Sequence, residues 1–115
     1  MTGVKRGKIA LKRRRKVLSH TKGFRWGRKS KERAAKEALL HAWTHAFRGR
    51  KEKKRNFRSL WQVKINAVAR ENGLSYSKFM AILKAKNIKL DRKILADLAE
   101  NEAATFNKVV EFAKN

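Results

Sequence analysis

The chain has 115 residues, of which 32 are Lys or Arg and 9 are Asp or Glu, so its formal net charge is +23. Such a charge on so small a chain requires a polyanion nearby, most commonly nucleic acid, with an anionic membrane surface as the alternative. The lack of Cys excludes disulfides and thiolate metal sites, and no apolar run in the sequence approaches the roughly 18 residues that span a bilayer.

Charge and apolar residues divide the chain into two parts. Residues 1–58 hold 22 basic, 3 acidic and 19 apolar residues, whereas residues 59–115 hold 10 basic, 6 acidic and 29 apolar residues. We therefore expect a basic extension over 1–58 and a compact helical domain over 59–115, a size near the lower limit for independent folding. The sequence has no Pro and no alternating strand pattern, so it predicts an all-α fold.

The first 30 residues form a basic arm with Gly near both ends. A short helix is expected around residues 9–18, but its apolar residues are few, and a helix without a buried face is marginal in water. We expect this arm to be disordered when free and to become ordered on its partner.

A long helix is predicted from about Lys31. Apolar residues then recur at steps of three and four, and the sequence Asn72-Gly73 is a typical helix end. About 42 residues at roughly 1.5 Å each would span about 60 Å if the helix were straight, so much of it must project from its own core. The sequence leaves open whether Gly49 bends it.

The last third predicts a compact unit of short helices. Ser75 and Asp91 can each cap a helix, with the pairs Leu74–Phe79 and Leu90–Leu95 as hydrophobic staples. A final helix is expected after about residue 101. The predicted core residues are Trp61, Ile65, Phe79, Leu83, Leu95 and Leu98.

Two basic clusters, residues 12–16 and 48–55, are the strongest functional signals. Consecutive basic residues on a helix point in all directions, which fits a surrounding surface such as folded RNA better than a flat membrane; the alternative is a solvated charge run. Phe24, between cations in a Gly-flanked loop, could stack on an unpaired base or pack against the arm itself. Trp43 and Trp61 lie on apolar stripes, which favours packing over RNA stacking.

Signals for a metal site or for catalysis are weak. Glu37, His41 and His45 are spaced at i, i+4 and i+8, and the outer two lie about 12 Å apart along a helix, too far for one ion. No phosphate-binding Gly loop or serine elbow occurs, and the carboxylates have no catalytic spacing. We expect no enzyme activity, no cofactor, no metal and no small-molecule substrate.

Several stretches together resemble the L-twenty family of bacterial-type large-subunit ribosomal proteins over nearly the whole length. These stretches are Val4-Lys5-Arg6-Gly7, Arg13-Arg14-Arg15-Lys16, Lys22-Gly23-Phe24, Lys54-Arg55-Asn56-Phe57-Arg58-Ser59-Leu60-Trp61, Ile65-Asn66-Ala67 with Arg70, Gly73-Leu74-Ser75-Tyr76-Ser77 and Leu90-Asp91-Arg92-Lys93. The sequence departs from the family pattern at Gly3, Gly49, Gln62 and Lys64, and residues 26–33 match poorly. The family opening at residues 4–7 also leads us to expect a mature N-terminus rather than a transit peptide.

The resemblance implies a structural component of the large ribosomal subunit. Family members thread a basic extension into large-subunit (23S-type) ribosomal RNA, place a small helical domain at the ribosome surface, support early assembly, take no part in peptidyl transfer, and in several cases repress their own messenger RNA. The implied partners are ribosomal RNA, neighbouring large-subunit proteins and, as for several members, its own messenger RNA, on cytoplasmic bacterial ribosomes or organellar ones. The expected RNA-binding residues are Lys5, Arg6, Lys12, Arg13, Arg14, Arg15, Lys16, Lys22, Phe24, Arg25, Arg28, Arg48, Arg50, Lys51, Lys53, Lys54, Arg55, Arg58, Lys64 and Arg70.

Three other hypotheses remain open on the residues alone. A histone-like DNA-packaging protein would bind plain duplex DNA at least as well as structured RNA. A cationic membrane-active protein would become helical on anionic lipid and cause vesicle leakage. An enzyme acting on RNA would need an acid–base pair, which the sequence does not offer.

Overall fold

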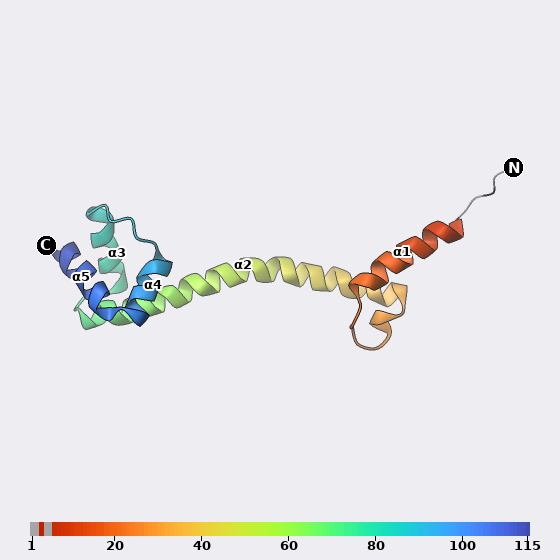
Figure 1. Cartoon of the computed structure of the whole chain (residues 1–115), viewed down its shortest axis with the longest axis horizontal. Coiled ribbons are helices and arrows are strands. Elements are labelled where there is room, and N and C mark those ends of the chain that lie inside the picture. Colours follow the sequence, from red (N-terminus) through yellow and green to blue (C-terminus); the bar gives the residue numbers. More distant parts are fainter. Residues whose placement is uncertain (1–2, 4–5) are drawn as a thin grey trace. The chain divides into compact units, whose positions relative to one another are not determined.

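The computed structural model describes Gly3 and residues 6–115, and within these residues it contains helices and no strand. The predicted all-α fold is thereby confirmed. The chain divides into two compact units, Met1–Lys51 and Glu52–Asn115, and the long helix contributes residues to both. The elements are α1 (Arg6–His20), η1 (Trp26–Lys29), α2 (Glu32–Glu71), α3 (Tyr76–Ala85), α4 (Arg92–Asn101) and α5 (Ala103–Lys114). Figure 1 labels the five α-helices.

The N-terminal unit consists of α1, a turn, η1 and the first part of α2. Gly23 has a φ of +88°, a conformation that favours glycine, and the amide of Phe24 donates to the carbonyl of Thr21 at 3.0 Å across this turn. The unit has a small buried core of Thr21, Ala35 and Leu39, whereas no residue of α1 is buried. Most of its basic residues therefore stay on the surface.

Helix α2 continues through Gly49 without interruption of its helical structure. A glycine inside a helix costs about 1 kcal/mol relative to Ala, and the Lys and Arg residues around it are good helix formers that offset this. The ribbon of α2 is correspondingly continuous in Figure 1.

The C-terminal unit holds the main hydrophobic core. The end of α2 provides Ile65 and Ala69, and α3 provides Phe79 and Leu83, all fully or almost fully buried. Helix α5 packs against both α3 and α4. From α4 and α5 the core receives Leu95, Ala96, Ala99, Phe106, Val110 and Ala113, and Trp61 and Leu98 are among the partly buried residues packed against it.

Local chemistry fixes the helix ends of the C-terminal unit. Gly73 ends α2 and has a φ of +79°. Its amide donates to the carbonyl of Arg70 at 3.0 Å, and the amide of Leu74 donates to the carbonyl of Ala69 at 3.0 Å. These two hydrogen bonds form a Schellman motif. The predicted stop at Asn72-Gly73 is therefore confirmed. Asn87 ends α3 in the same way, with a φ of +57°.

Replacing Asp91 by Ala should destabilise the C-terminal unit by about 1 kcal/mol, the usual cost of losing an N-cap. The Asp91 carboxylate accepts a hydrogen bond from the amide of Ile94 at 2.8 Å, as the capping prediction requires. Thermal denaturation followed by circular dichroism measures the loss. Asp91→Asn keeps the acceptor and should lose only a few tenths of a kcal/mol. Equal losses in both variants would contradict the capping role.

Candidate nucleic-acid interface

The basic side chains of α1 are exposed around its circumference. Successive residues of a helix are rotated by about 100°, so a run of five cations cannot share one face. One of them is tied down locally, since Arg14 Nη2 donates to the carbonyl of Ser30 at 2.9 Å. The exposed candidates on this helix are Arg6, Lys12, Arg13, Arg14, Arg15 and Lys16. Lys5, also predicted to bind RNA, lies outside the described residues.

Three predicted contacts between α1 and α2 are also exposed, namely Lys22 and Arg25 in the turn and Arg28 in η1. Phe24 is only partly exposed, and together with Arg28 and several α2 residues it lines a hollow of about 430 Å³. Phe24 therefore faces a hollow that it shares with the first turns of α2. Trp26, by contrast, is 79% exposed and has an unusual positive φ of 53°.

The middle of α2 carries the densest group of cations. In this stretch the predicted contacts are all exposed, and the ammonium of Lys51 lies 4.5 Å from the ring centre of Phe47, a cation–π distance. Phe57 and Leu60 are also exposed, so no core covers the stretch. The exposed cations are Arg48, Arg50, Lys51, Lys53, Lys54, Arg55 and Arg58.

At the beginning of α2, Glu32 and Lys36 form an ion pair of 2.9 Å at i,i+4 spacing. The hydrogen bond from Lys36 is the main reason that the pKa of Glu32 is held below its ordinary value, with a smaller contribution from the charge of Arg14. Glu32 thus remains ionised and offsets one cation of this region. A pair this exposed contributes little to stability.

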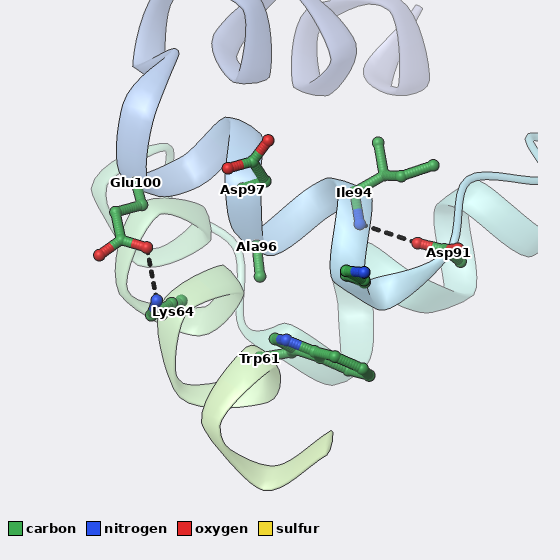
Figure 2. A pocket seen from close by; sticks show the side chains of 8 residues that line it. Trp61, Lys64, Asp91, Ile94, Ala96, Asp97 and Glu100 are labelled. Carbon is green, nitrogen blue, oxygen red and sulfur yellow. Dashed lines mark hydrogen bonds and ion pairs between the residues drawn. The ribbon is translucent and has the colours of Figure 1, made fainter. Parts of the chain in front are cut away.

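The two candidates of the C-terminal unit have different surroundings. Lys64 is partly buried and ion-paired with Glu100, beside a hollow of about 530 Å³ that is also lined by Trp61, Asp91 and Asp97 (Figure 2). Sequence reasoning missed this pairing, because the partner lies on α4.

Arg70 is exposed, and its Nε donates to Asn66 Oδ1 at 3.3 Å. The same Asn66 oxygen accepts from the amide of Tyr76 at 3.1 Å, so it links Arg70 to the start of α3. This hydrogen bond uses one of the five N–H donors that an arginine side chain carries.

Replacing Lys64 by Gln should change RNA affinity much less than replacing Arg58 by Gln. The ammonium of Lys64 already pairs with Glu100, and a phosphate there would approach carboxylates. Arg58 is exposed on the cationic stretch. Filter binding to large-subunit ribosomal RNA across a salt series compares them. Arg58→Gln should reduce the slope of log affinity against log salt by about 0.7–0.9, the value for one phosphate contact. An equal reduction for Lys64→Gln would contradict this assignment.

The three residues considered for a metal do not form a site. Across the part of the chain that the structure describes, no group of three His, Cys, Asp or Glu side chains is placed to hold an ion. Glu37 and His41 instead line the hollow beside Phe24. None of the described helices is long and apolar enough to cross a membrane.

Fold and surface together define a class, that of small all-helical proteins with exposed cations on several helices and a compact hydrophobic unit at the C-terminal end of the chain. The model of the family described as ribosomal protein L20 matches residues 3–109. The chain belongs to this family and is a protein of the large ribosomal subunit, a structural class of protein.

Proposed function

We propose that this chain binds large-subunit ribosomal RNA directly and supports early assembly of the large subunit, without taking part in peptidyl transfer or other catalysis. The observation that supports it best is the exposure of cations around α1 and along the middle of α2. A surface that is basic on all sides suits the interior of folded RNA, where phosphates approach from several directions.

We propose a division of labour along the chain. The basic part, up to about residue 58, lies among RNA segments and neutralises their phosphates, while residues 59–115 form a compact anchor. Neighbouring large-subunit proteins and the chain's own messenger RNA are further proposed partners. The proposed location is the ribosome of a bacterial cytoplasm, and the same chemistry would serve an organellar ribosome.

Sedimentation of a cell lysate through a sucrose gradient, at moderate and at high salt, tests the proposal. The protein should co-sediment with large subunits and whole ribosomes and resist the salt wash. Binding assays with deproteinised large-subunit RNA and with plain duplex DNA complete the test, and RNA should bind more tightly. A protein that remains at the top of the gradient, or that prefers duplex DNA, would support a DNA-packaging role instead.

A further inference from the structure

An apolar hollow lies between α1 and α2 within the N-terminal unit. It has a volume of about 330 Å³. Leu39, only 5% exposed, is its most buried lining residue, whereas Leu40 and Trp43 are more than half exposed. The lining residues are Lys16, Val17, His20, Lys36, Leu39, Leu40 and Trp43. Exposed apolar surface of this kind, surrounded by polar residues, commonly marks a binding site.

Two aromatic rings line this hollow. His20 and Trp43 meet edge to face, with 5.7 Å between ring centres and an angle of 79° between ring planes. This contact sets the orientation of the indole, yet 54% of Trp43 remains exposed. An oriented and accessible indole is the kind of platform on which an unpaired nucleobase stacks.

The charges around the hollow favour an anionic occupant. Its only charged or titratable lining residues are Lys16, Lys36 and His20, and no carboxylate lines it. Lys36 already bonds Glu32, so Lys16 is the freer cation of the two. The N-terminal unit as a whole holds 18 basic and 2 acidic residues. An uncharged apolar peptide would make no favourable electrostatic contact with these cations. A nucleobase within an RNA chain has flanking phosphates that can pair with them.

We propose that this hollow receives one unpaired nucleobase of the bound RNA, which stacks on Trp43 while a flanking phosphate pairs with Lys16. The proposal rests on the proposed RNA-binding function and adds to it a single-base site. It also assigns a recognition role to Trp43, for which the sequence pattern favours packing. An apolar side chain of a protein partner is the competing occupant.

Fluorescence of Trp43 tests the proposal directly. The chain has three Trp, so the double variant Trp26→Phe/Trp61→Phe leaves Trp43 as the sole indole. Circular dichroism verifies that this variant keeps its helix content. Titration with deproteinised large-subunit ribosomal RNA should quench the emission of Trp43, because a stacked base is an efficient contact quencher. A fully paired RNA duplex, which offers no free base, should bind with much less quenching.

A second measurement compares two substitutions at the same position. Trp43→Leu keeps an apolar side chain but removes the stacking surface, and it should weaken binding to large-subunit RNA by roughly 5- to 100-fold. Trp43→Phe keeps an aromatic face and should restore most of the affinity. Phe112→Ala is the control, because Phe112 is 70% exposed on α5 of the other unit, and it should bind as the parent does.

The possible outcomes distinguish failure of the base site from failure of the proposed RNA-binding function. If the protein binds RNA but Trp43 is not quenched and Trp43→Leu retains full affinity, the base site is wrong and the RNA-binding function stands. If Trp43→Leu binds RNA normally but fails to enter large subunits, a protein side chain occupies the hollow and the base site is again overturned. If the parent chain does not bind RNA, both proposals fail.

Discussion

Replacing Arg50, Lys51, Lys53, Lys54 and Arg55 together by Gln should weaken binding to large-subunit ribosomal RNA by on the order of a thousand-fold near physiological salt. All five side chains are exposed on α2. Each phosphate that a cation neutralises releases nearly one counterion, and this release favours binding. The losses in binding free energy add up over the five substituted residues.

The salt dependence provides the sharper measurement. If the parent chain contacts about ten phosphates, log affinity should fall with log salt at a slope of roughly −7 to −9. Loss of five contacts should make this slope shallower by about 4, the sum of five contributions of 0.7–0.9 each. Filter binding at several salt concentrations gives both the loss of affinity and the change in slope from one set of samples.

A matched control distinguishes local contacts from bulk charge. Five Lys of the C-terminal unit are also exposed and lie outside the proposed contacts, and their replacement by Gln lowers the formal charge from +23 to +18, as the α2 variant does. The control positions are Lys78, Lys84, Lys86, Lys89 and Lys108. The control should keep a slope close to that of the parent. Equal losses in both variants would mean that net charge, and not the α2 stretch, determines binding.

Replacing Phe79 by Ala should unfold the C-terminal unit or bring it close to unfolding. Phe79 is completely buried, and its ring centre lies 5.3 Å from that of Phe106. Truncation of a buried Phe costs about 3–5 kcal/mol, through lost burial and the cavity left behind. At about 0.05–0.15 kcal/mol per residue, a unit the size of Glu52–Asn115 has only about 3–10 kcal/mol in total.

Thermal unfolding followed by circular dichroism, with NMR of the ring-shifted methyl groups as a probe of the core, measures this effect. Phe112→Ala removes the same side chain from a site that is 70% exposed, and it should shift the melting temperature little. A Phe79→Ala protein that melts like the parent would show that the core does not depend on the Phe79–Phe106 contact.

Helix ends and core positions of the C-terminal unit could be predicted from the sequence because their causes are local. Ser75 accepts a hydrogen bond from the amide of Lys78, and Asp91 caps α4, as expected from residue type alone. The end of α3 at Asn87 was not predicted, because an Asn in the left-handed conformation is a weaker signal than the Gly that ends α2. Burial of Phe79 and Leu95 follows from their helical spacing.

Much of the candidate site could not be predicted, because it depends on contacts between residues distant in sequence. The pairing of Lys64 with Glu100 requires that α4 lie beside the end of α2, which no local pattern specifies. The hollow at Trp43 requires that the chain turn at Gly23 so that the start of α2 lies beside α1. The sequence does not signal this packing, because α1 alone has too few apolar residues to indicate a packed face. Exposure of the cations, by contrast, could be predicted, because 22 basic residues with only 3 acidic partners in residues 1–58 cannot be buried.

The crowding of cations along α2 has a consequence for the protein before it meets any partner. Arg50 and Lys54, Lys51 and Arg55, and Lys54 and Arg58 are like-charge pairs at i,i+4 spacing, each of which opposes the helix by a few tenths of a kcal/mol. Dissolved salt screens this repulsion. Added salt should therefore shift the helix–coil equilibrium of the free chain towards helix over the same concentrations at which it is expected to weaken the proposed binding to RNA.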